Sequence, residues 1–138
     1  MATKRMVLVV LAISVIALGV GSRRLEFESP LLNKYLGDAL YAVMFYLFLS
    51  LIWERGRPLL KAALVWLLMV SIELFQLTGI PLKLRREESV LARSASILLG
   101  TEFSWLDLLA YLAGIAMIVT VDLAVFEKGG WRRDRWGQ

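Results

Sequence analysis

The residues best suited to chemistry lie one helical turn apart inside an apolar stretch. Glu73 and Gln76 occur in the string SIELFQLTG, within the apolar run at 59–80. An ionisable side chain inside a bilayer is costly, so a partner, water or a ligand must compensate it. The Glu73 carboxylate and the Gln76 amide could therefore bind a polar group, and Glu73 could also act as a general base.

Other polar residues are expected on the same side of the membrane. Asp38 and Asp107 each open an apolar segment, and Arg93 belongs to a connecting loop. The planar guanidinium of Arg93 is suited to bind phosphate or carboxylate. Helical spacing gives each aspartate a tyrosine on its own face. We therefore predict an outer-facing polar pocket whose ligand-binding candidates are Glu73, Gln76, Arg93, Asp38, Asp107, Tyr41 and Tyr111.

Each of these residues also has a structural interpretation. Glu73 could be a buried partner of Arg93, in a pair that binds nothing else. Asp107 could complete a capping box with Ser104 at the start of its helix. Asp38 could only complement the dipole of its helix.

Four apolar segments are long enough to cross a bilayer, which takes about 20 helical residues. They span residues 6–21, 35–53, 59–80 and 105–126. The sequence thus predicts an all-α fold, with residues 1–138 forming a single transmembrane domain of four helices. The first segment also resembles a signal peptide, but the later apolar segments are by themselves enough to make the chain a membrane protein. We expect this segment to be retained as an anchor.

The connecting segments differ in character. Pro58 is suited to open the third helix. Residues 81–103 form a longer outer loop whose second half, LARSASILLGTEF, is half apolar and is expected to be interfacial or partly re-entrant. In the last span, Ala110 and Gly114 form a small-xxx-small pair that lets another helix approach closely. Asp122 is expected to snorkel toward water, and residues 127–138 to form a basic tail.

Basic residues set the expected orientation. With the N-terminus inside, nine basic residues fall on the cytoplasmic side and seven, in longer segments, on the outer side. This bias predicts a multi-pass protein with both termini cytoplasmic. Trp53, Trp105 and Trp131 near the expected helix ends suit an aromatic belt.

Composition excludes several classes of function. Hydrophobic residues make up 59% of the 138 residues and charged residues 20%, which is unlike a soluble domain. Cysteine and histidine are both absent, so disulfides, thiolate and imidazole catalysis and the commonest zinc ligands are excluded. We expect no metal and no cofactor. The net charge is +4, and the basic residues cluster at the ends of apolar runs. This placement favours contact with lipid head groups over binding of nucleic acid.

Three strings in order carry a resemblance to a known family. KYLGDALYAVMFYL, SIELFQL and LLGTEFSWLDLLAYLAG flank an arginine-bearing loop. Together they resemble a family of small bacterial four-helix membrane proteins of the DUF2809 type, whose function is unknown. More distantly the chain resembles the VanZ-like group. That resemblance implies a bacterial cytoplasmic membrane, with matching positions at Asp38, Glu73, Gln76, Arg93, Asp107 and Gly114.

Three functions are compatible with these patterns. The first is a binding protein for a polar or anionic lipid head group, a lipid-linked precursor or another amphiphile. The second is a structural or assembly protein whose polar groups only pair internally, and the third is a lipid-modifying enzyme with Glu73 or Asp107 as base. A transporter is disfavoured because the chain has few helices and no inverted repeat. The expected partners are membrane lipids and not nucleic acid, and a homo-oligomer is left open.

Overall fold

The computed structural model describes residues 2–22 and 30–127, and within them every regular element is a helix. The predicted all-α fold is confirmed. Arg23, Arg24, Trp131 and the basic tail from residue 128 onward lie outside the described residues. The helices are α1 (Ala2–Ser22), α2 (Pro30–Ile52), α3 (Pro58–Gln76), α4 (Ile80–Arg86), α5 (Val90–Leu99), α6 (Trp105–Val121) and the π-helical turn η1 (Asp122–Glu127).

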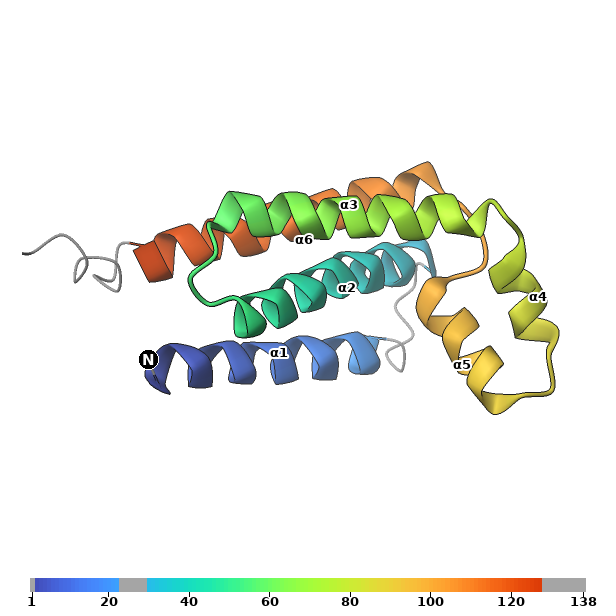
Figure 1. The fold of residues 1–138 in the computed structure, drawn as a ribbon, viewed down its shortest axis with the longest axis horizontal. Coiled ribbons are helices and arrows are strands. Elements are labelled where there is room, and N and C mark those ends of the chain that lie inside the picture. The colour runs from blue at the N-terminus through green and yellow to red at the C-terminus, as the bar shows by residue number, and fades with distance from the viewer. Residues whose placement is uncertain (1, 23–29, 128–138) are drawn as a thin grey trace, which may run out of the picture.

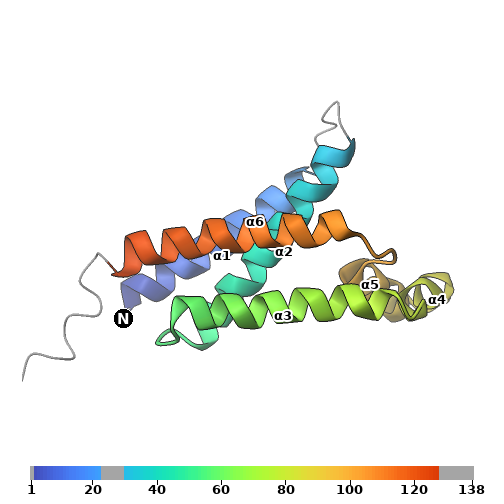
Figure 2. The ribbon, with the colours of Figure 1, turned by 90° about the horizontal axis from the view of Figure 1, so that it is seen from above.

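The four long helices form an elongated bundle, and the two short ones lie together at one end of it (Figures 1 and 2). α2 is central because it packs against α1, α3 and α6. α1 lies along α2, on the side away from α3 (Figure 1). α4 and α5 pack on one another beyond the C-terminal end of α3. This end also receives the first turns of α2 and α6.

Three helices are long and apolar enough to cross a membrane, namely 33–52, 58–76 and 105–124. The chain therefore has the character of a membrane protein. The apolar part of α1, Arg5–Gly21, is shorter. Leu67 on α3 and Leu109 on α6 are each more than 60% exposed, as lipid-facing side chains of a bundle would be.

The third apolar segment begins as predicted but ends earlier. Pro58 stands in the first turn of α3, whereas the helix stops at Gln76 rather than at Ile80. The backbone turns at Gly79, whose φ of 69° is a left-handed conformation that favours glycine. Ile80 then begins α4, with Pro81 in its first turn.

Residues 81–103 are more ordered than the predicted loop. Most of this segment lies in α4 and α5, so its backbone groups are largely satisfied within helices. α5 ends at Gly100, whose φ of 71° is again left-handed, and the chain then enters α6. Two short helices, of seven and ten residues, thus occupy most of the segment that the sequence predicts as an outer loop.

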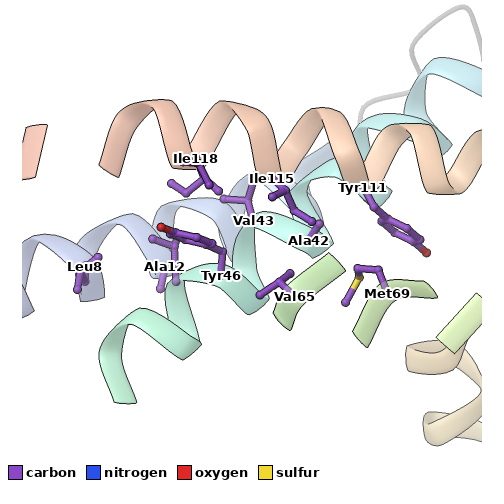
Figure 3. Packing of buried hydrophobic residues seen from close by; sticks show 12 residues of the cluster. Leu8, Ala12, Ala42, Val43, Tyr46, Val65, Met69, Tyr111, Ile115 and Ile118 are labelled. Carbon is purple, nitrogen blue, oxygen red and sulfur yellow. The ribbon is translucent and has the colours of Figure 1, made fainter. Parts of the chain in front are cut away.

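The core fills the space between the long helices (Figure 3). Ala42 of α2 and Met69 of α3 are fully buried in it. Where α2 meets α6, a Cβ added to Gly114 would lie 2.3 Å from the carbonyl oxygen of Ala39. The close helix approach predicted for the Ala110–Gly114 pair is thus confirmed at Gly114.

Candidate functional site

Glu73 is fully buried at the end of the bundle that carries α4 and α5. Its Oε1 accepts a hydrogen bond from the Tyr111 hydroxyl at 3.0 Å and a longer one from Gln76 Nε2 at 3.4 Å. Its Oε2 accepts a hydrogen bond from the backbone N–H of Ser104 at 3.2 Å. A carboxylate accepts at both oxygens, so three donors from α3, α6 and the α5–α6 connection suit this side chain.

Arg93 does not join this network. Its side chain is exposed on α5, while the buried position of that helix is Ser96. The interpretation in which Glu73 pairs with Arg93 was therefore wrong. Because a long cationic side chain on an exposed helix face can reach water, Arg93 has no need of a buried partner. Neutral donors compensate Glu73 instead.

Gln76 and Tyr41 fasten the end of α5 to the bundle. Gln76 Nε2 donates to the carbonyl of Leu99 at 2.7 Å, and the Tyr41 hydroxyl donates to the carbonyl of Leu98 at 2.9 Å. The last carbonyls of a helix have no partner within it, so these side chains from α3 and α2 satisfy them. A Cβ at Gly100 would lie 2.7 Å from Gln76 Nε2, so glycine is needed there.

Asp107 has a charged partner that sequence reasoning missed. Its Oδ1 lies 3.0 Å from Nζ of Lys34, and its side chain is only 7% exposed. This contact is an ion pair rather than a well-aligned hydrogen bond. Ser104 makes no side-chain cap, so the capping-box interpretation of Asp107 was wrong. Helical spacing could have revealed Lys34. It lies one turn before Asp38, so it shares a helix face with a residue that was predicted to lie in the same site as Asp107.

A cavity of about 750 Å³ opens at this end of the bundle. It brings together five of the predicted residues: Asp38, Tyr41, Gln76, Asp107 and Tyr111. Glu73 lies behind the lining, bonded to two of its members, and Arg93 is outside it. The lining also includes Lys34, Arg85 and Glu102, which were not predicted as site residues.

The rest of the cavity wall is largely apolar. α1, α2 and the end of α5 each contribute apolar side chains to it. Within residues 2–22 and 30–127, no group of three or more carboxylates is arranged to hold a metal ion. The apolar lining residues are Val15, Ile16, Val20, Leu40, Met44, Ile97, Leu98 and Leu99.

A second polar cluster lies at the opposite end of the bundle. Lys61 Nζ contacts Asp122 Oδ2 at 3.1 Å and donates to Ser50 Oγ at 2.9 Å. The Tyr46 hydroxyl also donates to Asp122 Oδ2. Asp122 is only 5% exposed, so the expectation that it snorkels to water was wrong. The 15 residues from Asp107 to Asp122 correspond to about 22 Å of helix, so the two polar clusters are well separated.

Comparison with known families agrees with the sequence motifs. The model of a family described as "protein of unknown function (DUF2809)" matches residues 27–115, which is more than half of the chain. The protein therefore belongs to the DUF2809 family. No solved structure matches the chain.

Proposed function

We propose that this DUF2809 protein is a multi-pass membrane protein that binds the head group of a membrane amphiphile. The observation that carries the proposal is the two-sided lining of the 750 Å³ cavity. Charged and hydrogen-bonding groups gather where α6 begins, whereas the walls from α1 and α5 are apolar. Ligand cavities commonly combine such apolar walls with a few polar groups that fix orientation.

The apolar part of the cavity suits the chain of a lipid. Val15 and Ile16 of α1 line the cavity together with Ile97 of α5. α1 packs on α2, and both α1 and α5 contribute side chains to the lining, so the cavity lies between these two helices. An acyl chain in contact with these side chains would leave its head group beside Lys34 and Asp107.

Glu73 serves this site indirectly. It is fully buried and accepts hydrogen bonds from both Tyr111 and Gln76, which line the cavity. We infer that Glu73 positions these two side chains and does not itself contact the ligand. For Glu73 alone, the same network also fits a structural protein whose polar groups only pair internally. Internal pairing does not account for the cavity beside Glu73.

The membrane placement follows the same reasoning. Arg5 Nε lies 3.0 Å from Glu54 Oε1, so the start of α1 is beside the α2–α3 turn and α1 runs the length of α2. We propose that α1 is a fourth span of the bacterial cytoplasmic membrane. With both termini cytoplasmic, as the basic residues favour, the cavity would face the outer side.

The α4–α5 hairpin would then rest in the outer membrane interface. Val90 and Leu91 are 79% and 81% exposed at the start of α5. Basic residues, Lys83 and Arg86, stand in the last turn of α4. Exposed apolar side chains next to basic ones are typical of segments that lie at the head-group level.

The test measures lipid binding directly. Purified protein in nanodiscs or detergent is titrated with a fluorescent short-chain phospholipid, and wild type is compared with Met44→Trp and Ile97→Trp, which fill the cavity. We expect saturable binding that each substitution abolishes without lowering the melting temperature. Leu109→Trp, at a 61% exposed position outside the cavity, is the matched control and should bind normally. Equal binding by all four proteins would contradict the proposal.

A further inference from the structure

The charges that line the cavity differ from those that the sequence predicted. Arg93, the expected anion ligand, is exposed and is not part of the lining. The lining contains three carboxylates, from Asp38, Glu102 and Asp107, but only two basic groups, from Lys34 and Arg85. A purely anionic head group would meet more like charge than opposite charge. The cavity instead suits a head group that carries a positive charge as well as a negative one.

Gln76 adds an independent requirement. Gln76 lines the cavity, and its relative exposure is only 6%. Its Nε2 donates a hydrogen bond to the backbone carbonyl of Leu99. That bond fixes which end of the amide is nitrogen, because a flipped amide would turn its oxygen toward the Leu99 carbonyl. Oε1 has no hydrogen-bond partner among the described residues. A buried acceptor without a donor is unfavourable, and a ligand that donates to it would remove this cost.

We propose that the ligand is a phospholipid whose head group carries a primary ammonium, as phosphoethanolamine does. This inference rests on the proposed function and specifies its ligand class. A primary ammonium has three N–H donors, enough for Gln76 Oε1 and for the carboxylates of Asp38 or Glu102. The phosphate contacts the guanidinium of Arg85, which can bind two oxygens at once. Lys34, half exposed and already beside Asp107, supplies further positive charge.

Head groups that differ only in their donors test this assignment. Short-chain phosphatidylethanolamine, its N,N-dimethyl derivative and phosphatidylcholine share the same phosphate and acyl chains but carry three, one and no ammonium donors. Their affinities for the wild-type protein are measured by competition against the fluorescent lipid. We expect binding to weaken along this series, with phosphatidylcholine at least roughly tenfold weaker than phosphatidylethanolamine. A factor of ten corresponds to about 1.4 kcal/mol, the scale of one hydrogen bond.

Phosphatidylglycerol separates the role of charge from that of donation. Its head group donates through hydroxyls but carries a net negative charge, so we expect it to bind more weakly than phosphatidylethanolamine. Glu102→Gln, at an exposed position of the lining, should reduce the preference for phosphatidylethanolamine over phosphatidylglycerol. Glu88→Gln, an exposed acidic residue outside the lining, is the matched control and should leave the preference unchanged.

The outcomes distinguish this inference from the proposed function. If phosphatidylcholine binds as tightly as phosphatidylethanolamine, or phosphatidylglycerol binds more tightly, and Met44→Trp abolishes this binding, the cavity binds lipid but the ammonium assignment is wrong. If no lipid binds saturably, or if Met44→Trp has no effect, the proposed function itself fails. The ordered series, together with a shift in Glu102→Gln alone, supports both.

Discussion

Lys61 and Asp122 form an ion pair of 3.1 Å between the start of α3 and the end of α6, with both side chains less than 10% exposed. Ser50 and Tyr46 of α2 bond to the same two residues, so three helices meet at this cluster. It fixes the end of the bundle opposite the cavity. A buried pair of this kind rarely adds much net stability over apolar residues, but losing one member leaves an uncompensated charge.

Replacing Lys61 by methionine should therefore destabilise the bundle strongly. The substitution keeps the length of the side chain and leaves the Asp122 carboxylate buried without its cation. We expect a loss of about 3–5 kcal/mol in the free energy of unfolding, measured by denaturation in detergent. The double variant Lys61→Met/Asp122→Leu should recover most of this loss. Lys83→Met, exposed on α4, should have little effect. A single variant as stable as wild type would show that the pair is not needed.

Glu73→Gln should destabilise the other end of the bundle. All of its three hydrogen bonds are accepted by the carboxylate, whereas a glutamine at this position accepts at one oxygen and turns an N–H₂ toward a donor. We expect a loss of about 1–3 kcal/mol, seen as a lower melting temperature in detergent.

Tyr111→Phe is the matched comparison for this network. It removes one donor to Glu73 while keeping the ring that packs near Tyr41. Its loss should be smaller than that of Glu73→Gln, because the backbone N–H of Ser104 and Gln76 still bond to the carboxylate. An unchanged or raised melting temperature in Glu73→Gln would mean that the charge of Glu73 is held at a cost to stability.

Gly114→Ala should separate α2 from α6. The added methyl would lie 2.3 Å from the Ala39 carbonyl oxygen, too close for any real contact, so the helices must move apart. Overpacking of this kind typically costs about 1–3 kcal/mol, which thermal unfolding would detect. Gly37→Ala is the control, because a methyl there meets nothing within 4 Å and should cause no loss. Equal stability of the two variants would contradict the close approach at Gly114.

Helical periodicity was sufficient to predict much of this architecture. Three of the apolar segments are long enough to span a bilayer, and such segments form helices because their backbone groups must be satisfied internally. Given those helices, the alternating direction of the chain brings Asp38, Gln76 and Asp107 to the same end. The candidate site was therefore predictable as a region, since five of the seven residues predicted for it line the cavity.

The pairing of charges was not predictable in the same way. The partners of Glu73 and Asp107 depend on which face each helix presents to its neighbours. Arg93 was expected in a loop that could reach inward, but α5 is a helix and Arg93 is on its exposed side. Lys61 lies near the start of α3 and Asp122 follows the end of α6, yet only the register of these two helices reveals that they meet.

The proposed topology predicts labelling from opposite sides of the membrane. The chain has no cysteine, so single cysteines can be introduced without background labelling. Arg55→Cys, between α2 and α3, and Glu88→Cys, between α4 and α5, are both at exposed positions. If α3 spans the membrane, an impermeant maleimide should label Glu88→Cys from outside and Arg55→Cys only after permeabilisation. Arg5→Cys should behave like Arg55→Cys if α1 is a fourth span, because Arg5 lies beside Glu54 of the α2–α3 turn. Labelling of Arg5→Cys from outside would rule out the proposed cytoplasmic N-terminus.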